Sequence, residues 1–151
     1  MNMGDQQAYI TEVYQQVFKN KETGSESEIK SKIEAKVSKY FAPVYEQWSN
    51  NIHYTYESFL SHVNEVNSRS DADFAIEFLS CTVQGDSNIV VVRTVVADTA
   101  SNAFLSGVLS TWAFTKDRKM LWCKEVLFDT IESDTCGESQ DPKNWKPDVT
   151  V

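Results

Sequence analysis

One acidic residue interrupts an apolar strand pattern late in the chain. The segment Met120–Phe128 alternates as a β-strand does. Its period of two puts Glu125 on the face that also carries Cys123 and Leu127. A carboxylate on an apolar face calls for an explanation, because burial of an unpaired charge is unfavourable. Desolvation would raise the pKa of this carboxyl group and suit it to proton transfer or ligand binding.

Two less specific interpretations of Glu125 stand beside the chemical one. Arg93 interrupts an apolar strand face in the same way, and charges on adjoining strands often pair. Glu125 could also point into a subunit interface. The sequence leaves all three interpretations open.

Two further residues are candidates for acid or base chemistry. Asp129 lies at the end of the same strand as Glu125, where a turn role would suffice but where an acid could also meet a ligand. His62 lies three residues after Phe59 on a predicted helix, beside its apolar stripe, so it can face either a pocket or solvent. The catalytic candidates are therefore Glu125, Asp129 and His62.

Composition and motifs exclude several classes of function. A formal net charge of −8 argues against a nucleic-acid partner, because phosphate binding needs clustered Lys and Arg. No phosphate-binding loop or nucleophile elbow is present. The three cysteines and two histidines lack metal-ligand spacing; they are Cys81, Cys123, Cys136, His53 and His62. We therefore expect neither a metal nor an organic cofactor.

The elements that must position these residues divide into helices first and strands second. Helical spacing of apolar residues predicts three amphipathic helices, with Ser25 or Ser27 as the cap of the second and Pro43 beyond its end. A polar loop and a short extended segment separate them. The predicted helices are Ala8–Phe18, a second helix that begins at the Ser25 or Ser27 cap and ends at Phe41, and Tyr56–Asn67. The loop is Lys19–Gly24, and the extended segment is Val44–Trp48.

Four apolar, β-branched and aromatic segments then follow one another with short polar turns between them. This order predicts an α+β fold, in which helices are followed by a strongly curved antiparallel sheet that forms a cone around a pocket. Gly107 predicts a bulge or sharp bend within the third strand. The predicted strands are Phe74–Gln84, Ile89–Ala97, Ala103–Thr115 and Met120–Phe128.

The chain of 151 residues fits one domain, which we assign to residues 1–131. Residues 132–151 are polar and acidic and form a C-terminal tail, which Trp145 could dock onto the domain. The first residues lack the pattern of a secretory signal, and no apolar run is long enough to span a bilayer. We therefore expect a cytoplasmic protein without a membrane partner.

Four local segments, in this order and spacing, resemble the SnoaL-like branch of the nuclear transport factor 2-like superfamily. The resemblance extends over residues 33–129 and implies a cone of curved antiparallel sheet capped by helices. It also implies a homodimer that associates through the outer face of the sheet. The segments that carry it are Lys39–Tyr45, Tyr56–Val63, Val90–Val96 and Trp122–Leu127.

This chain departs from the family pattern at two positions, because relatives often have His where it has Trp48 and Thr94. A Trp48 side chain inside the cone would make the pocket smaller and more apolar. His53 corresponds to the family's pocket entrance. The candidate ligand contacts are Trp48, His53, Tyr56, Phe59, Thr94 and Trp112.

Three functions follow as hypotheses. The first is binding of a small apolar molecule in the cone, without catalysis. The second is a cofactor-free isomerase, cyclase or dehydratase, with Glu125 or Asp129 as the base and His53, His62 or Tyr56 polarising a carbonyl group. The third is a dimeric protein-interaction scaffold that uses the acidic tail and Trp145 for recognition.

Overall fold

The structure is a computed structural model that describes residues 3–69, 74–84, 88–98, 104–128, 131–132 and 139–140. Asp129, Cys136, Trp145 and most of the predicted tail lie outside these residues. None of the described helices is long and apolar enough to cross a membrane. The elements are α1 (Met3–Val13), the π-helix η1 (Tyr14–Lys19), α2 (Glu26–Tyr40), β1 (Phe41–Ser49), β2 (Ile52–Tyr54), α3 (Tyr56–Ser68), β3 (Phe74–Val83), β4 (Ile89–Asp98), β5 (Phe104–Phe114), β6 (Met120–Phe128), β7 (Ile131–Glu132) and β8 (Ser139–Gln140).

Side-chain caps define where the second and third helices begin. Ser25 is the cap of α2, and its hydroxyl accepts from the backbone N–H of Glu28 while the Glu28 carboxylate accepts from the backbone N–H of Ser25. Thr55 caps α3 in the same reciprocal way with Ser58. The first helix continues from α1 into η1, so that it extends on both sides of the predicted Ala8–Phe18.

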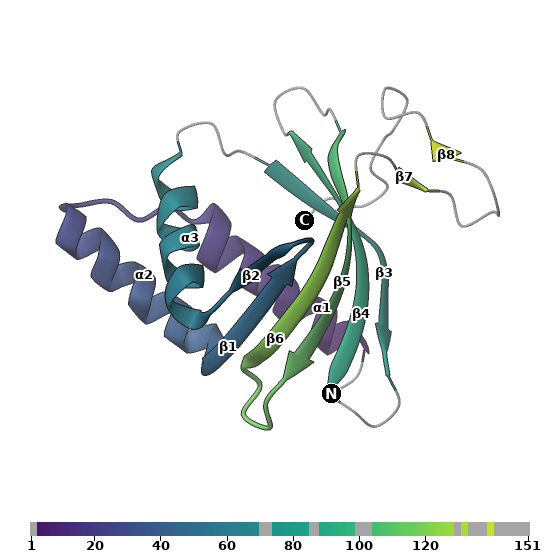
Figure 1. The fold of residues 1–151 in the computed structure, drawn as a ribbon, viewed down its shortest axis with the longest axis horizontal. Helices are drawn as coiled ribbons and strands as arrows, with labels where there is room; N and C mark the ends of the chain where they lie inside the picture. The colour runs from purple at the N-terminus through teal and green to yellow at the C-terminus, as the bar shows by residue number, and fades with distance from the viewer. Residues whose placement is uncertain are drawn as a thin grey trace.

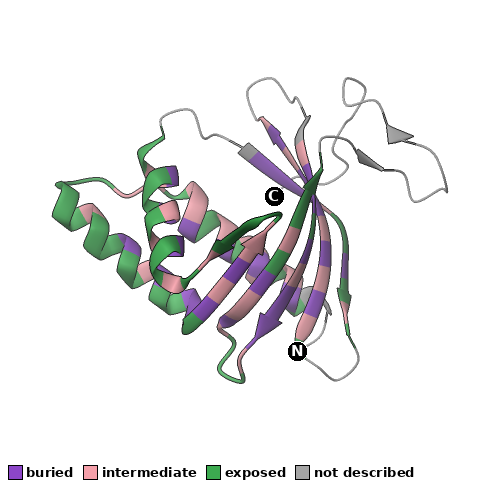
Figure 2. Cartoon of the chain, viewed as in Figure 1, coloured by how far each residue is buried: buried purple, intermediate pink, exposed green. Residues whose placement is uncertain are grey.

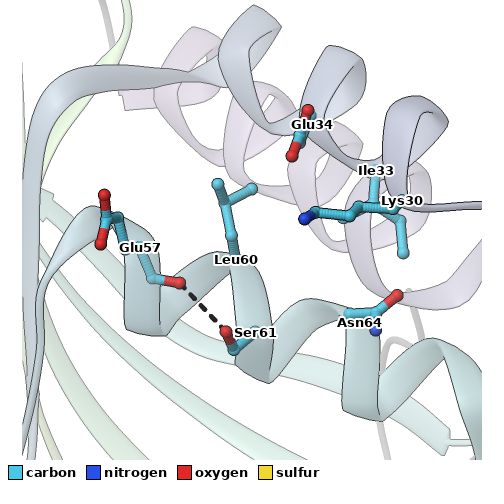
Figure 3. Close-up of a pocket in the computed structure, with 7 residues that line it drawn as sticks. All are labelled: Lys30, Ile33, Glu34, Glu57, Leu60, Ser61 and Asn64. Atoms are coloured by element: carbon cyan, nitrogen blue, oxygen red, sulfur yellow. Dashed lines mark hydrogen bonds between the residues drawn. The ribbon is translucent and has the colours of Figure 1, made fainter. Parts of the chain in front are cut away.

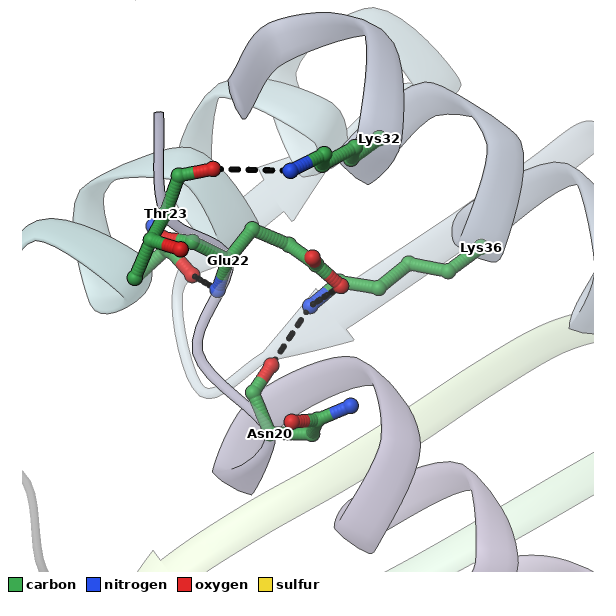
Figure 4. Close-up of polar contacts among 6 residues, drawn as sticks. Asn20, Glu22, Thr23, Lys32 and Lys36 are labelled. Carbon is green, nitrogen blue, oxygen red and sulfur yellow. Dashed lines mark hydrogen bonds and ion pairs between the residues drawn. The ribbon is translucent and has the colours of Figure 1, made fainter. Parts of the chain in front are cut away.

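Hydrogen bonds and an ion pair connect the polar loop between η1 and α2 to its neighbours (Figure 4). Lys36 of α2 donates to the backbone oxygen of Asn20 at 2.9 Å and lies 3.5 Å from the Glu22 carboxylate. The backbone N–H of Glu22 donates to the Asn67 side chain of α3 at 2.7 Å. These contacts connect the loop to both α2 and α3.

The strands form one six-stranded sheet with the order β2-β1-β6-β5-β4-β3, and β7 pairs with β8 outside it. The pairs among β3 to β6 are antiparallel, as their short turns predict. The sheet as a whole is mixed, because β1 runs parallel to β6. No hairpin joins these two strands, so turn chemistry does not set their relative direction. The α+β prediction is confirmed, and the expectation of a wholly antiparallel sheet is corrected at this one pair.

The sheet curls around the helices and is not closed (Figure 1). Register shifts mark the bends, including one between the pairs Val96–Ser106 and Ala97–Phe104. This shift falls just before Gly107, which itself pairs regularly with Val95. The prediction of an irregularity in this strand is therefore right in kind and displaced by about two residues.

The core lies between the concave face of the sheet and the helices, as the burial colours of Figure 2 show. The concave face is the one that carries Tyr45 of β1, and the outer face is the opposite one. Phe59 of α3 is fully buried, and its ring lies 4.8 Å from Phe41 and 4.9 Å from Tyr45. Phe18 of η1 also contacts Phe59, with 6.2 Å between ring centroids. Tight aromatic packing therefore joins helices and sheet.

Candidate functional site

Glu125 points toward the concave face of the sheet. It lies on β6 between Ser110 of β5 and Ser49 of β1. Its Oε1 atom accepts from the Ser49 hydroxyl at 2.5 Å and from the Gln47 amide at 3.3 Å. The Gln47 side chain in turn accepts from the Tyr45 hydroxyl at 2.8 Å. Because Tyr45 is fully buried in the core, this chain of hydrogen bonds places the carboxyl group inside the curl.

The strand period explains how β1 supplies these partners. Tyr45, Gln47 and Ser49 alternate along the strand and therefore share one face. Parallel pairing of β1 with β6 then brings Ser49 directly beside Glu125. We call Tyr45, Gln47, Ser49 and Glu125 the Glu125 network. All partners of the carboxyl group in this network are neutral, and none of the ion pairs among described residues includes Glu125.

Burial dominates the electrostatics of the site. It raises the pKa of the Glu125 carboxyl group, although the Ser49 hydrogen bond acts in the opposite direction. Burial also raises the pKa of the Tyr14 hydroxyl well above its usual value, and the negative charge of Glu125 adds to that increase. The pKa of the Cys123 thiol is raised well above its usual value by the same two causes, in the same order. Glu125 and Tyr14 are therefore near each other and both favour the protonated form.

Two polar atoms of this region remain available. Within the described residues, neither Oε2 of Glu125 nor the Tyr14 hydroxyl makes a hydrogen bond. Neither atom is fully buried. The network thus fixes one oxygen of the carboxyl group and leaves the other without a hydrogen bond in the described part of the chain. A carboxyl group held in this way can donate or accept one further hydrogen bond.

Trp112 and Thr94 also lie on the concave face. Trp112 is 3% exposed, and its indole N–H donates to the Ser110 hydroxyl at 2.9 Å. The Tyr14 ring meets Trp112 edge to face, with 6.3 Å between centroids. Thr94 is 2% exposed and aligns with Val108 of β5. This pair lies two residues along the strands from the pair of Val92 and Ser110. The structure therefore brings Trp112 close to the Glu125 network and places Thr94 on the same face.

Arg93 does not pair with Glu125, so the ion-pair interpretation is wrong. Arg93 aligns with Leu109, and Leu109 aligns with Val126. All three alternate with concave-face residues and lie on the outer face, where Val126 is 47% exposed. Glu125 also does not point to the outer face, which removes the interpretation of a subunit contact there.

Trp48 and His53 lie on the outer face, away from the Glu125 network. Trp48 directly follows the buried Gln47, so its side chain takes the opposite direction. The rings of Trp48 and His53 stack in parallel at 4.8 Å, and the Lys124 ammonium lies 5.2 Å from the Trp48 centroid. His53 Nε2 is also 3.6 Å from the Glu46 carboxylate. Trp48 therefore does not point into the cone, which is the condition for a smaller and more apolar pocket, and it lies away from the concave face where a ligand contact was expected.

The remaining predicted residues lie on α3. Phe59 belongs to the aromatic core described above. His62 is half-buried, its ring lies 5.1 Å from Tyr54, and burial lowers its pKa. Tyr56 is turned toward α2, since burial and then the charge of Glu34 raise its pKa. The structure does not bring His62 or Tyr56 into the Glu125 network.

Sequence reasoning missed most partners of Glu125. Ser49 and Gln47 were visible as part of the alternation with Tyr45, but the sequence gives no signal that this strand pairs with Met120–Phe128. Tyr14 fitted an ordinary helical stripe. The useful signal would have been polar residues at every second position after a buried tyrosine.

A separate hollow of about 350 Å³ lies between α2 and α3, outside the concave face (Figure 3). The residues that line this hollow are Lys30, Ile33, Glu34, Glu57, Leu60, Ser61 and Asn64.

Among the described residues, no group of His, Cys, Asp and Glu is arranged to bind a metal ion.

Neither a protein-family model nor a curated protein matches the sequence, whereas solved structures do. A SnoaL-like family protein from Agrobacterium tumefaciens strain C58, suggested to be an isomerase, matches with a TM-score of 0.59 and 10% identity over 82% of this chain and 98% of that one. An NTF2-like protein of unknown function from Exiguobacterium sp. 255-15 matches with a TM-score of 0.58 and 11% identity over 81% and 99%.

The designed NTF2-fold protein NT-9 matches with a TM-score of 0.54 and 14% identity, over 85% of this chain and 88% of that one. Sequence identities this low carry information about fold and not about ligand or reaction. The structural matches agree with the observed order of helices and strands and with the curled sheet. The chain therefore has the nuclear transport factor 2-like fold that SnoaL-like proteins share.

Proposed function

We propose that this protein binds a small, largely apolar molecule on the concave face of its sheet, with Glu125 as the polar contact. The observation that supports the proposal is that the two oxygens of the Glu125 carboxyl group have different hydrogen-bonding states. Oε1 is held by Ser49 and Gln47, whereas Oε2 makes no hydrogen bond within the described residues. Binding sites commonly combine an apolar lining with a few polar groups of fixed direction.

The apolar part of the site is supplied by residues that surround the network. Trp112 and Cys123 lie one row from Ser110 and Glu125 on the same face. The raised pKa of Glu125 means that its carboxyl group holds a proton at higher pH than an exposed carboxyl group would. A protonated Oε2 can donate to a carbonyl or ether oxygen of the ligand, and this would orient an otherwise apolar molecule.

Titration with the neutral dye Nile red tests this proposal, because the dye fluoresces in apolar surroundings and carries a carbonyl acceptor. We expect saturable binding that weakens as pH rises through the pKa of Glu125. Glu125→Leu should weaken binding about tenfold, which corresponds to loss of one hydrogen bond to the ligand. Glu46→Gln on the outer face is the matched control and should bind as the wild type does. Unchanged binding by Glu125→Leu would contradict the proposal.

A cofactor-free isomerase is the second candidate, and one observation favours it. The negative charge of Glu125 acts on the Tyr14 hydroxyl, and neither that hydroxyl nor Oε2 of Glu125 makes a hydrogen bond within the described residues. Ionised Glu125 could remove a proton from a carbon next to a carbonyl group and return it to another carbon. Tyr14 could donate a hydrogen bond to the carbonyl oxygen as negative charge develops there.

This candidate predicts conversion of a β,γ-unsaturated ketone into its conjugated isomer, which ultraviolet absorbance detects. With 3-cyclohexen-1-one as the probe, we expect Glu125→Gln to lower the rate at least about a hundredfold. Tyr14→Phe should lower it to a smaller extent, and Glu46→Gln should leave it unchanged. An equal rate for Glu125→Gln and the wild type would leave binding without catalysis as the function.

We further propose that two copies associate through the outer face. Leu109 and Val126 are neighbours on adjoining strands and are 38% and 47% exposed. Exposed apolar side chains that lie together favour association. Sedimentation equilibrium should give twice the monomer mass for the wild type and for the control Ser27→Lys on α2. Val126→Lys should give the monomer mass, and a monomeric wild type at about 100 micromolar would contradict this proposal, because stable dimers form well below that concentration.

A further inference from the structure

The turn between β1 and β2 lies beside Glu125 and begins with a residue in an unusual backbone conformation. This residue, Asn50, has a φ angle of 53°, in the left-handed region that few residues other than glycine adopt. Asparagine is one of the few that tolerate it. Ser49, directly before it, ends β1 and aligns with Glu125 of the neighbouring strand β6 (Figure 1). The turn therefore begins where the Ser49 hydroxyl donates to the Glu125 carboxyl group.

Asn50 makes two hydrogen bonds to β6, one on each side of Val126. Its backbone N–H donates to the backbone oxygen of Glu125 at 3.0 Å. Its side-chain Oδ1 accepts from the backbone N–H of Leu127 at 3.0 Å. If the register of the two strands is continued beyond Ser49, Asn50 stands opposite Val126. In a parallel pair, a residue in that position bonds to the residues before and after its partner through its own N–H and C=O.

The side chain of Asn50 therefore replaces a backbone oxygen in the ladder. A regular parallel strand has a φ angle of about −120°, so the chain leaves strand geometry at Asn50 and turns toward β2. The N–H of Leu127 would then lack a partner from β1, and Oδ1 supplies one. Asparagine and aspartate combine a side-chain oxygen at this position with tolerance of the left-handed region, whereas glycine offers only the tolerance.

We propose that Asn50 is the positioning residue of the Glu125 network, because its two hydrogen bonds hold β6 in the register at which the Ser49 hydroxyl reaches Oε1 of Glu125. Within the described residues, no hydrogen bond joins Asn50 to the carboxyl group itself, so it acts through Ser49 and the backbone. Its effect on ligand binding rests on the function proposed above. Its effect on the ionisation of Glu125 does not depend on any ligand.

Asn50→Gly provides the test, since glycine permits the left-handed backbone and removes only the side-chain hydrogen bond. Amide hydrogen exchange, followed by nuclear magnetic resonance, should be at least about fivefold faster at Leu127 than in the wild type. The carboxyl carbon signal of Glu125, followed across pH, should give an acid ionisation constant at least about twofold smaller, because the Ser49 hydrogen bond favours the charged form. A loss of global stability alone would not change the ionisation of the folded molecule.

Two further variants make the test specific. Asn50→Asp retains an oxygen at the position of Oδ1 and should keep the slow exchange of the Leu127 amide. Asn51→Gly introduces glycine at the next residue of the same turn and should leave both the exchange of Leu127 and the ionisation of Glu125 as in the wild type. Unchanged exchange of Leu127 in Asn50→Gly would overturn the proposal, and so would faster exchange without a change in the ionisation constant.

Nile red binding separates this proposal from the proposed function. The pH at which the dye is released should rise in Asn50→Gly together with the ionisation of Glu125, because the same proton is involved in both. If exchange and ionisation change as expected but the pH profile of dye binding does not move, the positioning role of Asn50 is supported. In that case Glu125 is not the polar contact of the ligand, and the proposed function is the part that fails.

Discussion

Removal of the Ser49 hydroxyl is the sharpest perturbation of the Glu125 network. In Ser49→Ala, Oε1 of Glu125 loses its shortest donor, at 2.5 Å, and the Gln47 amide loses an acceptor at 2.9 Å. A hydrogen bond to a charged group contributes about 1.5 to 3 kcal/mol and one between neutral groups about 1 kcal/mol. Because Ser49 is half-buried, we take the lower part of the first range. The variant should therefore lose about 2 kcal/mol when Glu125 is ionised.

The loss should depend on pH, with a sign that follows from the raised pKa of Glu125. A raised pKa in the folded state gives stability that is present below the ordinary carboxyl pKa of 4.5 and is lost as pH rises through the folded-state value. Removal of the Ser49 donor raises that pKa further, because the hydroxyl favours the charged form. The destabilisation should therefore grow from about 1 kcal/mol at the acidic end to about 2 kcal/mol at the alkaline end.

Urea unfolding between about pH 5 and about pH 8.5 measures this difference. Ser49→Thr retains the hydroxyl and should show little pH dependence beyond that of the wild type. Ser80→Ala removes an exposed strand serine of the same sheet and should stay within about 0.5 kcal/mol at every pH. A loss for Ser49→Ala that is the same at both ends of this range would refute the reasoning, because Glu125 would then not titrate in contact with Ser49.

Two further predictions concern stability. Glu125→Gln should be more stable than the wild type at about pH 8, where the wild type carries an unfavourable buried charge, and this gain should shrink toward pH 4.5. Urea unfolding at both pH values measures the difference in stability. A variant that is less stable than the wild type at the higher pH would contradict the prediction. Phe59→Ala should lose about 3 to 5 kcal/mol, because its ring is fully buried among Phe18, Phe41 and Tyr45, whereas the partly exposed Phe128→Ala should lose much less in the same assay.

The types of the elements were predictable because their signals are local. The Ser25 cap, the apolar spacing of α3 and the short turns between strands each involve residues close in sequence. The change from α1 to the π-helix η1 was not predictable, since its sequence reads as ordinary helix. In the structure, η1 begins at Tyr14, and its Phe18 packs against Phe59, a residue more than 40 positions away in sequence.

The candidate site was predictable in part. Strand periodicity by itself placed Glu125, Cys123 and Leu127 on one face and Arg93 on a face of another strand. It could not decide which face is concave, because β6 carries apolar residues on both: Cys123 is buried on one face and Val126 is exposed on the other. The strand of Trp48 presented the same ambiguity, and there the residue expected inside lies outside.

The sequence by itself determined the helices, most of the strands and the presence of a carboxylate on an apolar strand face, because those properties depend on neighbouring residues. Only the tertiary structure decided that this carboxylate faces the concave side and meets Ser49 and Gln47. Ser49 lies 76 positions from Glu125 in sequence, and a parallel strand pair without a connecting hairpin joins them. Register between distant strands results from the packing of the whole sheet on its helices, and no local pattern encodes it.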